Sequence, residues 1–247
     1  MSKILAITNQ KGGVGKTTTS VNLAASLSET GRRILLVDLD AQGNATMGSG
    51  CNKHDLEHSG YEVLTGHADI TEVMLYAEDA GYHLLPGNSD LTAAEVELMP
   101  EEDRENRLGM ALASVRNDFD FILIDCPPSL NMLTINALAA ADGVLIPIQC
   151  EYYALAGLAE LIKIIRLVQN NFNSKLSIEG ALLTMFDSRL NLSKQVAEDV
   201  KSTFSQKVFK TIIPRNVTLS EAPSFGKPVI LYDIVSVGAK KYLEFAE

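Results

Sequence analysis

A glycine-rich loop at residues 10–18 constrains the fold of this chain more than any other feature of its sequence. The loop reads Gln-Lys-Gly-Gly-Val-Gly-Lys-Thr-Thr, follows an apolar run and leads into a helical pattern. Glycines let successive backbone N–H groups turn toward one point, where the N-terminus of a helix adds partial positive charge. Lys16 can reach β- and γ-phosphates there, and the Thr17 hydroxyl can ligate Mg²⁺. The strand–loop–helix order therefore predicts a nucleotide-phosphate site. The residues expected to contact the phosphates are Lys11, Gly12, Gly13, Val14, Gly15, Lys16, Thr17 and Thr18.

Apolar runs rich in β-branched residues alternate with helical patterns along the rest of the chain. Such runs are typical of strands that are buried on both faces of a parallel sheet. Alternating strands and helices predict a doubly wound α/β fold, with a mostly parallel sheet and helices on both faces. Without a repeat, linker or break in composition, residues 1–247 are expected to form a single domain. The predicted strands are Ile4–Thr8, Ile34–Asp38, Tyr82–Leu85, Phe121–Asp125, Val144–Ile148, Ile178–Met185 and Val208–Ile213, and the clearest predicted helices are Thr17–Thr30, Tyr153–Asn170 and Leu192–Phe204.

Two of the predicted strands end in carboxylates. The strand at 34–38 runs into Asp38 and Asp40, and the strand at 121–125 ends in Asp125 after four apolar residues. Ligands of open α/β sheets bind outside the carboxyl ends of the strands, so these carboxylates are expected to face the phosphate loop. Four apolar residues followed by Asp is the Walker B pattern, which predicts that Asp125 holds Mg²⁺ through water. For Asp38, a cap at the end of its strand is the alternative.

The charge of the chain is segregated. The formal net charge is −10, which by itself argues against nucleic acid as a partner. Residues 51–105, however, hold 14 acidic and two basic residues, whereas residues 189–227 hold seven basic and three acidic ones. The whole-chain charge therefore reflects one acidic lobe and does not exclude DNA. This lobe is a solvated surface or, alternatively, attracts a basic segment of a partner.

The phosphate loop departs from the general G-x-x-x-x-G-K-[ST] form, because Gln10 occupies the first glycine position and a second lysine stands at Lys11. In both respects it resembles the deviant Walker A loop of the ParA/MinD family of ATPases. The resemblance implies that Lys16 acts on the nucleotide of its own subunit and that Lys11 reaches the phosphates of a partner in an ATP-sandwich homodimer. It also implies that Asp40 orients the attacking water and that Asp38 supports the Mg²⁺ shell.

A later segment, residues 214–228, resembles the signature of the chromosomal ParA branch. The resemblance implies that Pro214 and Asn216 border the adenine, that Met185 packs on its face and that Glu221 lies near the ribose. An ordinary place in the core is the alternative for Met185, because methionine fills gaps in many cores.

Basic residues cluster around the predicted helix at 192–204. Lys194 and Lys201 are seven residues apart and so lie on one side of it, beside the apolar stripe. In ParA proteins of this type, such a surface binds double-stranded DNA once two ATP-bound subunits pair; a solubilising lysine face is the alternative. The chain shows no base-reading motif, so phosphate contacts without sequence preference are expected. The candidate DNA contacts are Arg189, Lys194, Lys201, Lys207 and Lys210.

Taken together, the resemblance implies an ATPase that segregates DNA, uses ATP and Mg²⁺, and is reset by a ParB-type centromere-binding partner. Three widely spaced cysteines fit a reducing cytoplasm, and a nucleoid-associated location follows from DNA binding. The alternatives are a positioning ATPase for another cargo, an ATP-dependent amide synthase or carboxylase, and a MinD-like membrane ATPase. The last is disfavoured because residues 239–247 have too little apolar face for a membrane-binding helix, so no membrane contact is expected.

Overall fold

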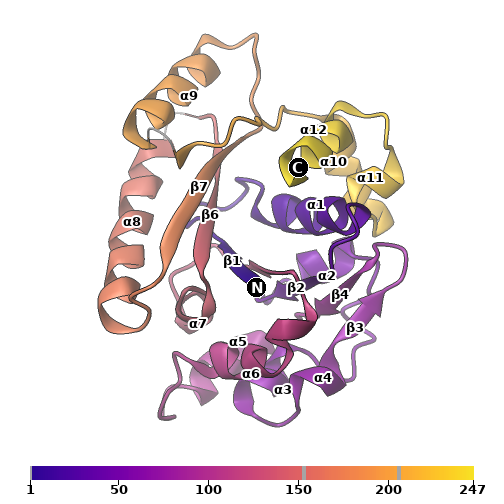
Figure 1. Cartoon of the computed structure of the whole chain (residues 1–247), viewed down its shortest axis with the longest axis vertical. Helices are drawn as coiled ribbons and strands as arrows, with labels where there is room; N and C mark the ends of the chain where they lie inside the picture. Colours follow the sequence, from indigo (N-terminus) through magenta and orange to yellow (C-terminus); the bar gives the residue numbers. More distant parts are fainter. Residues whose placement is uncertain (1, 152–153, 205–206) are drawn as a thin grey trace.

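The computed structural model describes residues 2–151, 154–204 and 207–247, which are organised around a seven-stranded sheet (Figure 1). The strand order is β3-β4-β2-β5-β1-β6-β7, and all neighbours are parallel except the antiparallel pair β3 and β4. This mostly parallel sheet confirms the predicted fold class. The strands are β1 (Lys3–Ile7), β2 (Ile34–Asp38), β3 (Leu75–Ala77), β4 (Tyr82–Leu85), β5 (Phe121–Asp125), β6 (Gly143–Gln149) and β7 (Ser177–Thr184).

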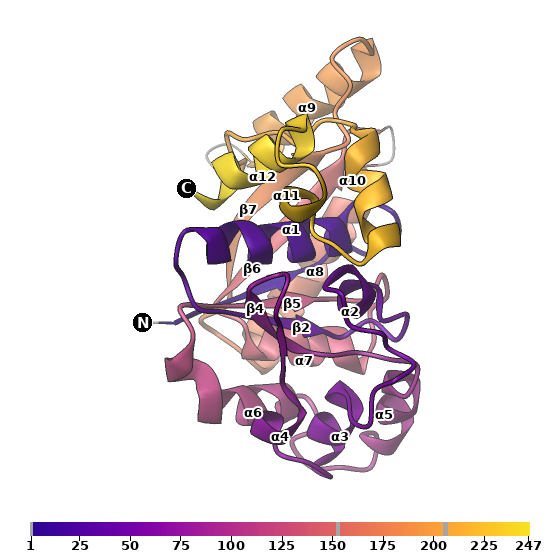
Figure 2. The same cartoon turned by 90° about the vertical axis from the view of Figure 1, so that its right-hand side faces the viewer.

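Helices cover both faces of the sheet (Figures 1 and 2). Helix α1 and the C-terminal helices α10–α12 lie on one face, and helices α3–α8 lie on the other. Helix α9 lies near the β7 edge, beyond the end of α8. The helices are α1 (Lys16–Glu29), α2 (Asn44–Gly48), α3 (Gly60–Thr65), α4 (Ile70–Val73), α5 (Leu91–Glu97), α6 (Arg107–Val115), α7 (Met132–Ala140), α8 (Ala154–Asn171), α9 (Asn191–Phe204), α10 (Val217–Glu221), α11 (Val229–Tyr232) and α12 (Val237–Ala246), with short 3-10 turns at η1 (Arg116–Asp118) and η3 (Ala222–Phe225).

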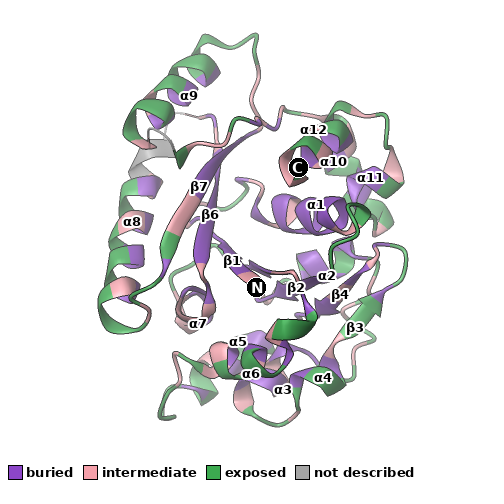
Figure 3. Ribbon diagram, in the orientation of Figure 1, coloured by how far each residue is buried: buried purple, intermediate pink, exposed green. Residues whose placement is uncertain are grey.

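The central strands are buried on both sides because successive side chains point to opposite faces of the sheet. In β1, Ile4 and Ala6 belong to the core beneath α6–α8, whereas Leu5 and Ile7 belong to the core beneath α1 and α12. Figure 3 shows this continuous burial along the middle of the sheet. The near-continuous apolar runs of the sequence follow from this two-sided burial.

Most predicted elements are observed to within a few residues. Strands β2, β4 and β5 have the predicted bounds, and α1 begins one residue before the predicted helix. The predicted helix at 153–170 corresponds to α8, although Tyr153 itself lies outside the described residues. Gly31, which follows α1, has a φ of 79° and donates its N–H to Ser28, as expected of a glycine that ends a helix.

The prediction of a strand at Val208–Ile213 is wrong. This segment contacts β7 through single parallel bridges, such as Ala181 with Val208, and through backbone bonds of 3.0 Å from Phe209 and 2.9 Å from Ile213. The chain bends at Lys210 between these contacts, so a continuous ladder does not form. The apolar pattern is that of a strand because the segment is buried against β7, although it does not pair along its length.

The edge strand β3 (Leu75–Ala77), three residues long, was not predicted from the sequence. Leu75 and Tyr76 are exposed there, so the segment has neither a continuous apolar run nor a clear alternation. The segment is extended because it pairs with β4, and its own residues do not indicate that pairing.

The packing of residues 207–209 on β7 predicts a position that tolerates no side chain. A Cβ on Gly180 would lie 2.7 Å from the Phe209 ring and 3.1 Å from the backbone oxygen of Lys207. We expect Gly180→Ala to lower the free energy of unfolding by about 1–3 kcal/mol through overpacking. In α6, Gly109→Ala is the control: its Cβ meets nothing closer than 3.7 Å, so it should raise stability by about 0.5–1 kcal/mol. Urea unfolding of the two variants tests this; equal effects would contradict it.

Candidate nucleotide-binding site

The phosphate loop joins the carboxyl end of β1 to the N-terminus of α1. Gly13 and Gly15 have φ values of 73° and 88°, in the left-handed region that favours glycine. Helix α1 begins at Lys16, and within the described part of the chain no side chain caps it. The first N–H groups of a helix have no partners inside the helix, so those of α1 are available to an anion.

A cavity of about 380 Å³ lies against this loop. The loop after β2, Pro128 from the loop after β5, and Met185 just after β7 form its other walls. The structure thus brings together residues that follow four different strands and are up to 173 positions apart in the sequence. The residues lining it are Gly12, Gly13, Gly15, Lys16, Thr17, Thr18, Asp40, Gln42, Asn44, Pro128 and Met185.

Lys16 is the buried cation of this cavity. Only 7% of the residue is exposed, and its Nζ donates to the backbone oxygen of Lys11 at 3.3 Å. Burial lowers the pKa of the Lys16 ammonium, and the nearby Asp125 opposes this shift. The charge of Lys16 is therefore poorly solvated by the protein alone, and an anion in the cavity would compensate it.

Asp125 is fully buried at the end of β5 and is held by two hydroxyls of α1. Its carboxylate accepts from Thr17 Oγ1 and from Ser20 Oγ, each at 2.8 Å. Burial, and after it the neighbouring Asp38, raise the pKa of Asp125. The Thr17 hydroxyl and the Asp125 carboxylate, two of the three predicted metal ligands, are thus in direct contact, and their binding of Mg²⁺ stays a prediction. Ser20 was missed, because nothing in its local sequence marks it as a partner of a residue 105 positions away.

Asp38 is oriented differently from the prediction. Its Oδ2 accepts from both the N–H and the hydroxyl of Thr46 at 2.8 Å, and its Oδ1 accepts from the Asp40 N–H at 3.1 Å. Asp38 is not among the lining residues of the phosphate cavity. This geometry favours the alternative reading, a cap at the end of the strand that holds the loop carrying Asp40. A place in the Mg²⁺ shell stays a prediction for Asp38.

Asp40 lines the cavity, opposite the phosphate loop, as predicted. Its Oδ1 accepts the Gln42 N–H at 3.0 Å, and its backbone oxygen accepts the Gly43 N–H at 2.8 Å. These local bonds order a tight turn between β2 and α2. The turn places the half-buried carboxylate where it can accept a proton or a hydrogen bond from a bound water.

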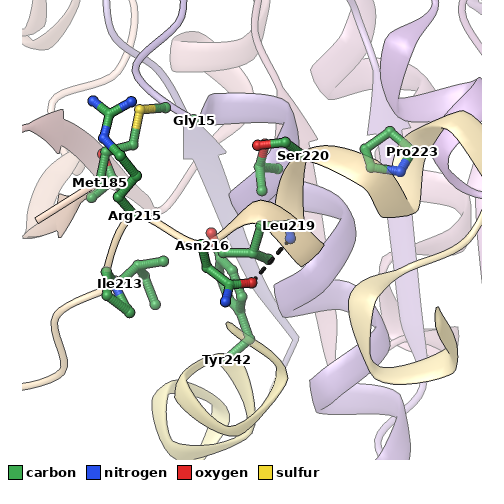
Figure 4. Close-up of a pocket in the computed structure, with 12 residues that line it drawn as sticks. Gly15, Met185, Ile213, Arg215, Asn216, Leu219, Ser220, Pro223 and Tyr242 are labelled. Carbon is green, nitrogen blue, oxygen red and sulfur yellow. Dashed lines mark hydrogen bonds between the residues drawn. The ribbon is translucent and has the colours of Figure 1, made fainter. Parts of the chain in front are cut away.

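A second cavity, of about 250 Å³, adjoins Gly15 and Thr18 on the other side of the loop (Figure 4). Three residues predicted to border the adenine line it: Met185, Pro214 and Asn216. Met185 has a φ of 49°, an uncommon conformation outside glycine that is frequently found at binding sites. Sequence reasoning missed its remaining walls, which come mainly from β7 and the C-terminal helices: Thr184, Ile213, Arg215, Leu219, Ser220, Pro223 and Tyr242.

Asn216 and Glu221, which were both predicted to lie near the nucleotide, form hydrogen bonds with other residues of the protein. The side chain of Asn216 caps α10 by accepting the Leu219 N–H at 3.1 Å, as Figure 4 shows. Glu221 does not line either cavity; its carboxylate is 3.4 Å from the Tyr232 hydroxyl, which donates to it. The expected position of Glu221 near a ribose therefore has no support in this geometry.

The candidate DNA contacts surround α9. Lys194 and Lys201 are exposed on this helix, and Lys210 is exposed on the segment that follows it. Arg189 forms a bidentate pair with Asp187, which lowers the pKa of that carboxyl to about 2, yet the Arg189 side chain is 86% exposed. Lys207 donates to the backbone oxygen of Ile178 at 3.1 Å. Thus Lys194, Lys201 and Lys210 are the least engaged of the five.

Within residues 2–151, 154–204 and 207–247, no helix is long and apolar enough to cross a bilayer.

Comparisons with known proteins agree with this geometry. Residues 2–178 match the model of the family described as AAA domain. The sporulation initiation inhibitor protein Soj of Bacillus subtilis is 56% identical over 247 residues, which cover 100% of this chain and 98% of that protein. The chromosome partitioning protein ParA of Myxococcus xanthus is 54% identical, covering 98% of this chain and 86% of that protein.

Solved structures share the fold over the whole chain. The cobyrinic acid a,c-diamide synthase of Mycobacterium smegmatis, with bound ADP and magnesium, is 41% identical at a TM-score of 0.87, covering 100% of this chain and 93% of that one. The cell division ATPase MinD of Pyrococcus furiosus is 27% identical at a TM-score of 0.81, covering 100% and 97%. The fold and the phosphate loop define a P-loop ATPase. With the relatives above, they show that the chain belongs to the ParA/Soj family of chromosome-partitioning ATPases.

The buried Asp125 predicts an unusual dependence of stability on pH. A carboxyl whose pKa is raised on folding keeps its proton where the unfolded chain has lost it, so the free energy of unfolding falls as pH rises through that range. We expect the nucleotide-free protein to melt about 2–4 °C higher at pH 6 than at pH 8, and Asp125→Asn to remove most of this difference.

Asp187→Asn is the matched control for this experiment. The pKa of Asp187 is lowered to about 2, so its carboxyl stays ionised across pH 6–8 and its loss should leave the slope unchanged. Differential scanning calorimetry without nucleotide measures all three proteins. An unchanged slope in Asp125→Asn would contradict the assignment.

Proposed function

We propose that this partition ATPase works as a single domain that pairs around ATP, binds DNA without sequence preference as a dimer, and is reset when a ParB-type partner stimulates hydrolysis. A cytoplasmic, nucleoid-associated location follows from that cycle. The observation that carries the proposal is the different placement of the two lysines of the phosphate loop, together with the identity to chromosome-partitioning relatives.

The two lysines point to different surroundings. Lys16 is buried in the phosphate cavity, whereas the Lys11 ammonium is 3.5 Å from Glu151 at the surface and the side chain is 36% exposed. Lys11 does not line the cavity of its own subunit. An exposed lysine at the rim of a phosphate site is positioned to serve a second subunit, where it would stabilise charge on the transferring phosphoryl group as an arginine finger does.

The donor set of the site fits ATP with Mg²⁺. Thr17 and the buried Asp125 supply hard oxygen atoms, which Mg²⁺ prefers, and the solved Mycobacterium structure of this fold holds ADP and magnesium. Bound Mg²⁺ would neutralise negative charge on the phosphates. In the proposed reaction Lys16 binds the phosphates, Asp40 orients the attacking water, and Met185, Pro214 and Asn216 surround the base.

Dimerisation would switch DNA affinity on. One subunit contributes Lys194, Lys201 and Lys210 as exposed cations, which supports about three phosphate contacts, and a twofold dimer doubles that number. Because the logarithm of the affinity changes by about 0.9 per phosphate for each tenfold change in salt, a monomer of this acidic chain should bind weakly and a dimer appreciably.

The similarity to a protein named a diamide synthase gives a second candidate, an ATP-dependent amide synthase of the same fold. It is less well supported, because the relatives named for chromosome partitioning are 47–54% identical over almost the whole chain. Positioning of a cargo other than DNA is a further alternative. The amide synthase alternative predicts no ATP-dependent binding to DNA, whereas the positioning alternative differs from DNA segregation in its partner.

Substitution of the two lysines separates their roles. Lys16→Ala should weaken nucleotide binding at least about 100-fold because it removes the buried cation of the site. Lys11→Ala should bind nucleotide within about threefold of the unaltered protein, but lose ATP-dependent dimers and at least about 100-fold in turnover. Equilibrium titration, sedimentation and phosphate release measure these effects. Normal dimers and turnover in Lys11→Ala would overturn its role in the partner subunit.

DNA binding tests the function itself. Affinity for a random-sequence duplex should be high only with ATP and should fall steeply with salt. Lys194→Gln combined with Lys201→Gln should reduce the salt slope of the dimer by about 3–4, since two charges are lost in each of two subunits. The control is Lys175→Gln, which alters an exposed lysine before β7, at the end of the strand far from α9. Absence of binding in every nucleotide state would refute DNA segregation.

A further inference from the structure

Helix α5 and the loop after it expose apolar side chains within the most acidic part of the chain. Leu91, Ala94 and Leu98 pack into the core, whereas Val96 is 68% and Met99 64% exposed. Acidic side chains surround this pair in the sequence. We define the α5 surface as Glu95, Val96, Glu97, Met99, Glu101 and Glu102.

The α5 surface is bonded to the loop that follows the Walker B strand. The carboxylate of Glu95 accepts from Nδ2 of Asn131, and Oδ1 of the same Asn131 caps α7 by accepting the Thr134 N–H at 3.0 Å. The Thr134 hydroxyl donates to the Ser129 oxygen at 2.6 Å. Since Pro128 lines the phosphate cavity, this chain of contacts runs from α5 to the wall of the site.

A second connection joins residues 104–108, which follow the α5 surface in the chain, to the middle of α7. The side chain of Asn136 donates to the Arg104 oxygen at 2.7 Å and accepts the Leu108 N–H at 3.0 Å. Asn136 is fully buried, so these bonds are shielded from water. These contacts join the α5 surface, and the residues that follow it, to α7 and to the loop at residues 126–131.

The negative charge of the α5 surface favours some binding partners over others. Between residues 95 and 107 there are six acidic and two basic side chains; Arg104 pairs with Glu105 and Arg107 with Glu101, so the surface stays acidic. A second copy related by a twofold axis would bring this surface against itself, and DNA or an anionic membrane would likewise meet like charge. A basic segment with apolar side chains is complementary both to the carboxylates and to Val96 and Met99. In Figure 2, α5 lies below α2, well separated from α9, so this segment would not compete with the proposed DNA surface.

We propose that the α5 surface docks a basic, amphipathic segment of the partner that stimulates hydrolysis, and that Glu95 and Asn131 transmit its binding to the phosphate cavity. The inference rests on the proposed function and adds the place and chemistry of the contact. Glu95 is a positioning residue in this scheme: it touches neither nucleotide nor water, but holds Asn131 and with it the loop beside Pro128.

The docking step is tested with the centromere-binding partner of the same organism and with a synthetic peptide carrying its basic segment. Val96→Ser combined with Met99→Ser should raise the partner concentration for half-maximal ATPase stimulation at least about tenfold and leave the unstimulated rate unchanged. The control combines Val235→Ser and Val237→Ser, which alters two similarly exposed apolar residues outside this surface. Charge reversal at Glu102 should weaken stimulation further, most at low salt.

The transmission step needs a different measurement. Glu95→Ala should lower maximal stimulation at least about fivefold while changing the half-maximal concentration less than twofold. Glu95→Gln should restore most of the stimulation, since its amide oxygen can still accept from Asn131. A merely structural role would lower the melting temperature and the unstimulated rate together, so both are measured for each variant.

The possible failures are distinct. If the unaltered protein is stimulated but the Val96/Met99 variant responds as the control does, the α5 surface is refuted and the proposed function stands. Equal loss of affinity and of maximal stimulation in Glu95→Ala and Glu95→Gln would refute transmission through Asn131. A partner that binds DNA sites yet never stimulates the unaltered protein would overturn the proposed reset, and the α5 surface with it.

Discussion

The carboxylate of Asp125 is buried between the sheet and α1, and two hydroxyls of that helix, from Thr17 and Ser20, hold it there. An ionised group in such a place is costly unless it is hydrogen-bonded or meets a cation. The site is arranged around this constraint: Lys16 provides one nearby charge, and Thr17 and Asp125 together provide oxygen donors suited to Mg²⁺. The same contacts fix the register of α1 on the sheet, so the phosphate loop and the Walker B strand cannot be displaced independently.

The strand order explains why these groups meet. Strand β5 lies between β1 and β2, and the register pairs Asp125 with Ile7 on one side and with Asp38 on the other. Three loops that carry functional groups therefore leave the same edge of the sheet side by side. In this arrangement Asp38 is fully buried and supports the β2 loop through Thr46, so that Asp40, two residues later, lines the cavity. One carboxylate positions the other.

The acidic and basic parts of the sequence also lie apart in the folded molecule. The acidic residues 51–105 include helices α3–α5 beneath the sheet, whereas α9 with Lys194 and Lys201 lies at the opposite end of the molecule (Figure 1). Two partners of opposite charge can thus approach one molecule without meeting each other. The proposed DNA contacts and the proposed partner contacts use these two ends, and each lies on an element connected to the loops of the nucleotide site: α9 follows Met185, and α5 is bonded to Asn131.

Features of this protein that depend on a short segment of the chain were predictable, and features that depend on distant contacts were not. The conformation of the phosphate loop and the positions of Asp40 and Asp125 were predictable because each depends on a short segment: glycines that reach positive φ, a lysine at a helix start, or a carboxylate at a strand end. The strand predicted at residues 208–213 failed because burial, which the apolar pattern reports, does not require a hydrogen-bonded ladder. The expected place of Glu221 near a ribose has no support from the cavities, because the orientation of α10 on the core decides which of its side chains face them.

By itself, the sequence determined the class of fold, the phosphate loop with its two lysines, and the carboxylates that accompany it. Only the tertiary structure decided that Lys11 is at the surface beside Glu151 while Lys16 is buried, and that Tyr242 and Ser220 line the second cavity. It also decided that Glu95 is bonded to a loop 36 residues away. The physical reason is the range of the interactions. Backbone conformation and strand burial follow from neighbours in the chain, whereas the surroundings of a side chain depend on which distant elements pack against it.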